Sequence, residues 1–243
     1  AHVLDGLKLM PASTTLAMHG DLDVAAGWAW LKAFMAKQDP AMARQFNATL
    51  LEMASNNIPV DELLGSLGGE LGMSVVLHPS KTVKFPMGQE FKNGAFVPQT
   101  IELPEPGLVL AVKVKNDLLL NMVGSMLVAQ GAESKKMNGV ELMILEAPPG
   151  ATPFPLSPTV MKTGDYLVFA STQELAKEVL SIQSGQSKGL VGTADFQKMT
   201  AGMELKGNHL FYLSPLVRKL GLKLVEDALA KEREFQNPQA RAA

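Results

Sequence analysis

His19, Asp21 and Asp23 alternate along the chain, with one residue between each pair. Imidazole and carboxylate groups bind divalent metal ions and act as acid or base in hydrolysis. The stretch 14–19 is typical of a strand, and alternate residues of a strand share a face, so these side chains are weak candidates for a metal site. No second ligand cluster has a matching spacing, and capping of a following helix also accounts for both aspartates. A metal-dependent hydrolase is therefore kept as an alternative, and we predict no catalytic residue, cofactor or resident metal.

Two glycine-rich segments resemble enzyme motifs but lack the context those motifs need. Residues 185–189 match the G-x-S-x-G pattern of hydrolases, in which the serine lies on a sharp turn between a strand and a helix. A helical periodicity precedes them here, so we expect Ser187 in a solvated loop. Residues 65–72 lack the Lys and Ser/Thr of a phosphate-binding loop and are typical of a helix end followed by a strand.

Trp30, Phe91 and Phe96 are candidates for an interaction surface. Trp28 and Trp30 are two residues apart in a predicted helix, so one face of that helix cannot bury both. Trp28 falls on the apolar stripe, which leaves Trp30 as an interface candidate, although packing under a neighbouring element also accounts for it. Phe91 and Phe96 flank the dipeptide Asn93-Gly94, which favours a two-residue hairpin turn.

The elements that must position these residues alternate between strands and helices. Period-two apolar segments predict strands at 14–19, 71–78, 108–114, 140–146, 159–162, 166–170 and 209–213. Capping residues predict helices that follow Asp23, Asp39, Asn116-Asp117, Ser171 or Thr172, and Ser214. We predict an α+β fold with a mixed or mainly antiparallel sheet and helices packed on one face. Recurring passages from a strand to a capped helix favour two related halves.

Residues 79–106 differ from their flanks because they contain five prolines. We expect an N-terminal α+β half at 1–78, a proline-rich excursion with a small hairpin at 79–106, and a C-terminal α+β half at 107–243. One continuous domain is the alternative. Long excursions in compact domains are often functional. This segment is therefore the first place where we expect a binding surface.

Composition excludes several classes of protein. The 243 residues include 22 basic and 24 acidic side chains, for a formal net charge of −2, which gives no electrostatic footprint for nucleic acid. With 47% hydrophobic and 19% charged residues the chain is not of the disordered class, and without cysteine it is not a disulfide or cysteine–zinc scaffold. The charge-free stretch 118–132 is shorter than the roughly 18–20 apolar residues of a membrane span, so we expect no span.

Several short motifs together resemble a known family. They are Leu9-Met-Pro-Ala-Ser-Thr-Thr-Leu16, Leu67-Gly-Gly-Glu70, Gly107-Leu-Val-Leu-Ala-Val-Lys-Val-Lys-Asn-Asp117, Asn138-Gly-Val140, Gly164-Asp-Tyr-Leu-Val168 and Leu210-Phe-Tyr-Leu-Ser214. The chain resembles a family of uncharacterised bacterial proteins that carry a domain of unknown function and are often described as envelope or putative exported proteins. The resemblance implies a bacterial, extracytoplasmic protein of the periplasm or cell surface. It supplies no activity and no site residues.

These observations together favour a non-catalytic extracytoplasmic protein that binds an envelope protein partner or a ligand. A small-molecule or lipid carrier is an alternative, and it predicts an enclosed apolar pocket of several hundred Å³. The other alternative is the metal-dependent hydrolase that uses His19, Asp21 and Asp23.

Overall fold

The computed structural model describes residues 2–92, 95–148, 150 and 152–236. Among these residues, eight strands form one sheet in the order β10-β2-β3-β4-β8-β7-β6-β5, in which every neighbouring pair is antiparallel. The strands of this sheet are β2 (Thr14–Asp21), β3 (Leu67–Lys92), β4 (Ala95–Val114), β5 (Glu133–Met137), β6 (Val140–Ile144), β7 (Thr159–Thr163), β8 (Tyr166–Ala170) and β10 (His209–Leu213). The short strands β1 (His2–Val3) and β9 (Lys206–Gly207) pair separately. The predicted α+β fold with a mainly antiparallel sheet is confirmed.

The helices begin where side chains satisfy their first backbone N–H groups. They are α1 (Val24–Gln38), α2 (Pro40–Ser55), α3 (Val60–Gly65), α4 (Leu118–Ala129), α5 (Gln173–Gln183), α6 (Ala194–Met199) and α7 (Pro215–Gln236), with 3-10 turns η1 (Asp5–Leu9) and η2 (Leu190–Gly192). Asp23 accepts a hydrogen bond from the Ala26 amide, and Asp39 accepts from Ala41 and Met42. Thr172, rather than Ser171, caps α5. An oxygen at the N-cap satisfies a donor that the helix leaves unpaired, so these positions could be predicted locally.

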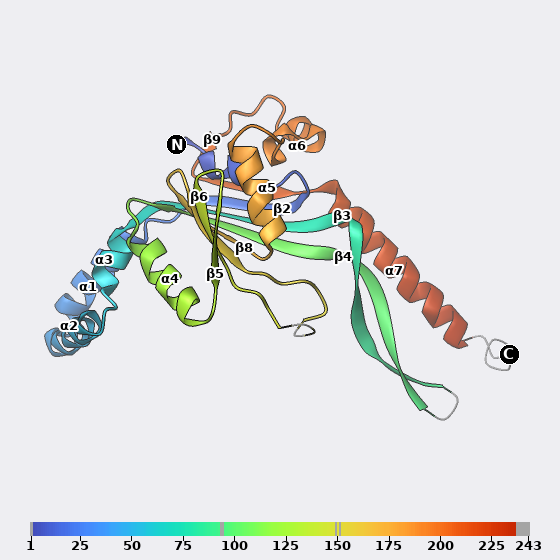
Figure 1. Cartoon of the computed structure of the whole chain (residues 1–243), viewed down its shortest axis with the longest axis horizontal. Coiled ribbons are helices and arrows are strands. Elements are labelled where there is room, and N and C mark those ends of the chain that lie inside the picture. The colour runs from blue at the N-terminus through green and yellow to red at the C-terminus, as the bar shows by residue number, and fades with distance from the viewer. Residues whose placement is uncertain (1, 93–94, 149, 151, 237–243) are drawn as a thin grey trace.

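Helices cover both faces of the sheet, rather than the one face that we predicted. Leu142, Met161 and Val168 pack under α5 on one face, together with η1. The next residues along the same strands, Met143 and Leu167, pack under α4 with Val160. Because successive side chains of a strand point to opposite faces, α5 and α4 must lie on opposite sides of the sheet. The two-faced packing follows from consecutive apolar residues in β6, β7 and β8, and Figure 1 shows α5 and α4 on opposite sides of these strands.

β3 and β4 form a ribbon that continues far beyond the sheet. Their pairing runs from Leu67 opposite Val114 to Lys92 opposite Ala95, with irregularities along the way. The expected borders at 78/79 and 106/107 therefore lie inside these two strands, and the hairpin is much longer than the small one we expected. The Asn93-Gly94 turn lies outside the described residues. One sheet contains strands from both expected halves. The segment that we expected to lie between those halves consists of the outer parts of β3 and β4.

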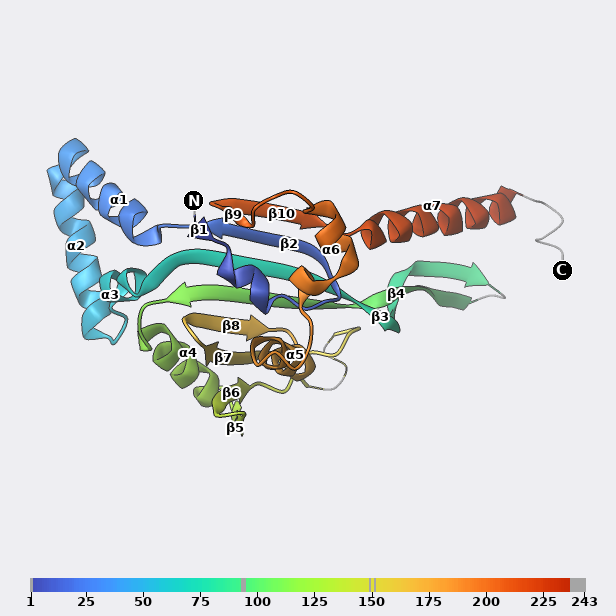
Figure 2. The ribbon, with the colours of Figure 1, turned by 90° about the horizontal axis from the view of Figure 1, so that it is seen from above.

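Two projections leave the ends of the sheet. Figure 1 shows α1, α2 and α3 as an arm at one end, and the β3–β4 ribbon with α7 at the other. Both projections descend on the side of the sheet where α4 lies, while α5 and α6 lie above it. Figure 2 shows α7 running beside the ribbon and beyond the body. Together, sheet and projections give the molecule the outline of an arch.

Candidate functional site

A cluster of polar side chains lies between η1 and the strands β2, β3, β4 and β8. Glu70 is 8% exposed and accepts hydrogen bonds from the Lys113 ammonium and, at 2.8 Å, from the Tyr166 hydroxyl. His2 lies at its rim, 2.6 Å from a carboxylate oxygen of Asp21 and 3.9 Å from Glu70. Burial of a carboxylate is costly unless it is paired and hydrogen-bonded. Lys113 and Tyr166 meet that requirement for Glu70.

His19 is the least accessible member of this cluster. Its side chain is fully buried, and its Nε2 lies 3.6 Å from Glu70, beyond hydrogen-bond distance. Within the described part of the chain, neither ring nitrogen has a hydrogen-bond partner. A Cβ atom at Gly6 would lie 2.7 Å from the ring, and one at Gly72 would lie 3.5 Å from it. The imidazole therefore fits because Gly6 lacks a side chain, whereas a Cβ at Gly72 would be in ordinary van der Waals contact with it.

The protonation states of the cluster do not suit proton transfer near neutral pH. Burial alone would raise the pKa of Glu70, but hydrogen bonds from Lys113 and Tyr166 outweigh it and hold the pKa below its ordinary 4.5. The hydrogen bond to Glu70 raises the pKa of Lys113, while burial and then the same carboxylate raise the pKa of Tyr166. Burial lowers the pKa of His19 below 6.5. General bases and nucleophiles work best with a pKa close to the working pH, and these shifts lead away from it.

A hollow of about 390 Å³ borders the cluster on its outer side. Lys113 and Tyr166 line it, together with Lys8, Asp5 and Asp165 from the surrounding turns. Its lysines and aspartates balance, so the hollow has no preference for a ligand of one charge. It is open and has a mixed lining that includes Leu9 and Ile182 beside these charged groups, so it is not the enclosed apolar pocket that a carrier needs.

His19, Asp21 and Asp23 do not come together as a set of ligands. His19 is buried, Asp21 pairs with His2, and Asp23 caps α1. Asp23 follows the end of β2, so it no longer shares the strand face of the other two. Over the described residues, no group of three His, Cys, Asp or Glu side chains is placed to hold a metal ion.

The sequence analysis missed Glu70, Lys113 and Tyr166 as members of a cluster. One available signal was the phase of Lys113, which follows the buried residues Val109 and Ala111 at intervals of two. A charged residue in phase with buried positions of a strand predicts an inward ammonium that needs a partner. No local pattern identifies that partner, because Glu70 and Lys113 are 43 residues apart.

The remaining candidates have separate locations. Ser187 lies in the loop after α5, as predicted, and the glycines of 65–72 lie at the end of α3 and the start of β3. Trp30 is 65% exposed on α1 and stacks on Phe34, while Trp28 packs against Phe46. Phe96 is exposed on β4. Phe91 pairs with it in β3, and the Phe91 side chain lies outside what the structure describes.

An apolar surface lies on the uncovered half of the sheet face on which α4 lies. We define this open face by eleven side chains of β10, β2, β3 and β4 that strand register places on one side. Four are exposed, namely Met18, Leu108, Phe211 and Leu213, and seven are half-buried, namely Leu16, Leu71, Met73, Val75, Leu77, Leu110 and Val112. Solvent-facing sides of antiparallel sheets usually carry polar residues, but this set includes no charged side chain. Phe211 is 63% exposed.

Comparisons with protein-family models, curated proteins and solved structures found no match to this chain. Among the helices that the structure describes, none combines the length and apolar composition that crossing a membrane requires. The evidence for its function therefore comes from the geometry of this molecule.

Proposed function

We propose that this protein is a non-catalytic binding protein whose partner is another protein that covers the open face. The observation that carries the proposal is an apolar face of four neighbouring strands on which Phe211 and Leu213 of β10, Met18 of β2 and Leu108 of β4 are exposed. Contiguous exposed apolar patches of this kind are rare on monomeric soluble proteins and mark interaction sites.

The neighbouring half of the same face indicates what kind of structure fits. There α4 places Leu119, Leu120, Val123 and Leu127 against Val160 and Leu167. A sheet that is apolar on one face is normally covered by another layer of secondary structure. An apolar helix is therefore the natural partner for the open face, because it would continue the layer that α4 begins.

The polar cluster supports the non-catalytic part of the proposal. Both carboxylate oxygens of Glu70 are engaged by Lys113 and Tyr166, and these three side chains come from β3, β4 and β8. The cluster therefore ties three strands together under η1. Its role in the proposal is to hold the sheet rigid while the opposite side binds.

We further propose an extracytoplasmic location in the bacterial periplasm or cell surface, where the partner is an envelope protein. The family resemblance and the absence of cysteine favour this location. Fractionation of the native host, followed by immunoblotting, tests it. Recovery of the protein in the cytoplasmic fraction alone would contradict it.

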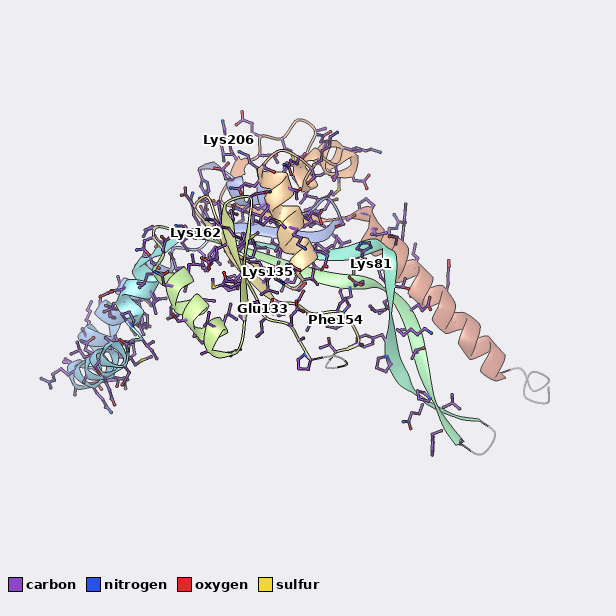
Figure 3. All side chains as sticks on the ribbon, viewed as in Figure 1. Lys81, Glu133, Lys135, Phe154, Lys162 and Lys206 are labelled. Atoms are coloured by element: carbon purple, nitrogen blue, oxygen red, sulfur yellow. The ribbon has the colours of Figure 1, made fainter. Side chains whose placement is uncertain are left out.

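Site-specific crosslinking tests the binding function. Met18 is replaced by a photo-crosslinking amino acid in the native host, and the attached protein is identified by mass spectrometry. Lys135 is the matched control, because it lies on the outer strand β5 and its side chain is 53% exposed (Figure 3). We expect a specific product from position 18 and none from 135.

A second substitution links that product to the face. Phe211→Glu introduces a charge opposite Met18, where the two strands pair. Burial of an unpaired charge is costly, so the product should diminish. The proposal fails if position 18 attaches no protein, or if the same products appear at position 135.

A further inference from the structure

α7 carries an apolar stripe that its own chain does not cover. Leu222, Val225 and Leu229 are 54%, 57% and 47% exposed. Their spacing of three and four residues places them on one side of the helix. Val217 and Leu220 lie on the other side and are half-buried. Within the described residues, α7 therefore resembles an amphipathic helix whose outer stripe lacks its usual apolar neighbour.

The position of α7 prevents it from covering the open face of its own chain. α7 begins at Pro215, and β10 ends at Leu213, so one residue separates the strand from the helix. From there α7 runs away from the sheet, beside the β3–β4 ribbon (Figure 2). Its stripe and the open face belong to the same molecule but cannot meet within it.

We propose that the partner of the open face is a second copy of this chain, which inserts its α7 there, and that the two copies do this reciprocally. The inference rests on the proposed function, because it names the protein that binds to the same face. A reciprocal exchange uses the same two surfaces on each copy, as an isologous two-fold dimer requires. Each α7 then takes the place beside α4 of the other copy.

The dimensions of the two surfaces agree with this arrangement. α7 has 22 residues, so its length is about 33 Å at about 1.5 Å per residue. Four strands about 4.8 Å apart present a face that is narrower than this. A standard interface buries roughly 800 Å² per partner, and the open face and the stripe together offer fourteen apolar side chains of each copy to the contact.

The charges of the two surfaces also permit the contact. The open face has no charged side chain to desolvate. Arg218 lies one turn before Leu222 on the same side of α7, and Glu226 lies beside the stripe; both are exposed, so they would lie at one end and one edge of the contact. The apolar part of each surface therefore meets the other with these two charges at its border.

Sedimentation equilibrium of the purified chain tests the dimer, with circular dichroism to verify the fold of each variant. We expect twice the mass of the chain for the unmodified protein at micromolar concentration. Phe211→Glu on the face and Val225→Glu on the stripe should each raise the dimer Kd by roughly tenfold or more. Met199→Glu is the matched control, because Met199 is 51% exposed on α6, which lies on the opposite side of the sheet from the open face, so its dimer Kd should not change.

Mixing the two defective variants distinguishes reciprocal exchange from other dimers. The Phe211→Glu copy keeps an intact α7, and the Val225→Glu copy keeps an intact face. The mixture therefore retains one of the two helix–face contacts, and it should associate more tightly than either variant alone. A direct face-to-face dimer predicts no such recovery.

Three results would overturn the inference: a monomeric unmodified protein, a dimer that both substitutions leave unchanged, or a mixture that shows no recovery. The proposed function is tested separately from the dimer. If the chain is monomeric while position 18 crosslinks to a different identified protein, the binding function stands and the second copy is wrong. If neither the crosslinks nor the dimer involve the face, both fail.

Discussion

His19 illustrates how a single residue type acquires its meaning from its surroundings. Its place beside two aspartates suggested a metal ligand, but Gly6 leaves space for the ring in the interior instead. A buried imidazole without hydrogen-bond partners favours the neutral form. The residue therefore links stability to pH, whatever the protein binds.

The pH dependence of stability is the first prediction at this scale. The pKa of His19 in the folded protein lies below 6.5, so the unfolded chain binds a proton at a higher pH than the folded protein does. The free energy of unfolding should therefore decrease as pH falls below 6.5 through that lowered pKa. The pKa of Glu70 is also lowered, but protonation of this carboxylate changes the free energy of unfolding only below about pH 4.5. Urea unfolding between neutral pH and about pH 5 measures the slope.

The control must remove the opposite contribution of His2. The hydrogen bond to Asp21 raises the pKa of His2, so its contribution is present below 6.5 and is lost as pH rises through the folded value. The slope is therefore compared in the His2→Gln background with and without His19→Leu. Equal slopes in the two proteins would contradict the prediction.

Gly6→Ala is the second prediction at the residue scale. The new methyl would lie 2.7 Å from two atoms of the His19 ring and 3.5 Å from Tyr166, so the cluster must shift. Overpacking of this kind costs about 1–3 kcal/mol in the free energy of unfolding. Gly27→Ala is the control, because its methyl meets nothing within 4 Å in α1 and should stabilise by about 0.5–1 kcal/mol. Thermal unfolding measures both, and a neutral Gly6→Ala would show that the ring is not confined.

The β3–β4 ribbon shows how an element can extend without adding to the core. Val76 is 3% exposed where β3 crosses the sheet, whereas Val97 is 46% exposed in the ribbon. Prolines at 98, 104 and 106 did not end β4, although proline removes a ladder donor. Both outer edges of the ribbon lack a neighbouring strand in the described residues, which is where proline is tolerated.

Replacement of residues 84–102 by Asn-Gly tests the independence of the ribbon. Val83 pairs with Leu103, so a two-residue turn can join the strands there. We expect the melting temperature to change little, because most of the removed side chains are exposed. Val76→Ala is the contrast, with an expected loss on the order of 2 kcal/mol from the core. Loss of cooperative unfolding in the shortened chain would show that the ribbon supports the fold.

At the scale of the whole molecule, an asymmetry between the two sheet faces stands out. One face is covered along its length by η1, α5 and neighbouring turns, which bury Ala17, Val76 and Tyr212 among others. The other face is covered only where α4 lies, and its remaining half is the open face. The two projections descend on that side. An arch of this kind leaves its underside available to a second molecule.

The position of most elements was predictable because it depends on contacts within a few residues. Asp23 and Asp39 cap the helices that follow them, and β2 and β10 begin at Thr14 and His209 as the alternation predicts. Helical periodicity also identified inward residues of α5, because Leu175 and Val179 are buried as predicted. For Trp30 the sequence left exposure and packing under a neighbouring element open, and the side chain is exposed.

The order of the strands and the covering of each face depended on tertiary structure. Glu70 and Tyr166 are 96 residues apart in sequence and meet only because β4 lies between β3 and β8. Likewise, Met18 and Val160 are both apolar residues of predicted strands. α4 covers Val160, whereas Met18 remains exposed. Caps and alternation are local properties, so the chain itself determines them. Register and layer packing are contacts between distant segments, and only the assembled sheet decides which apolar residues remain free to bind.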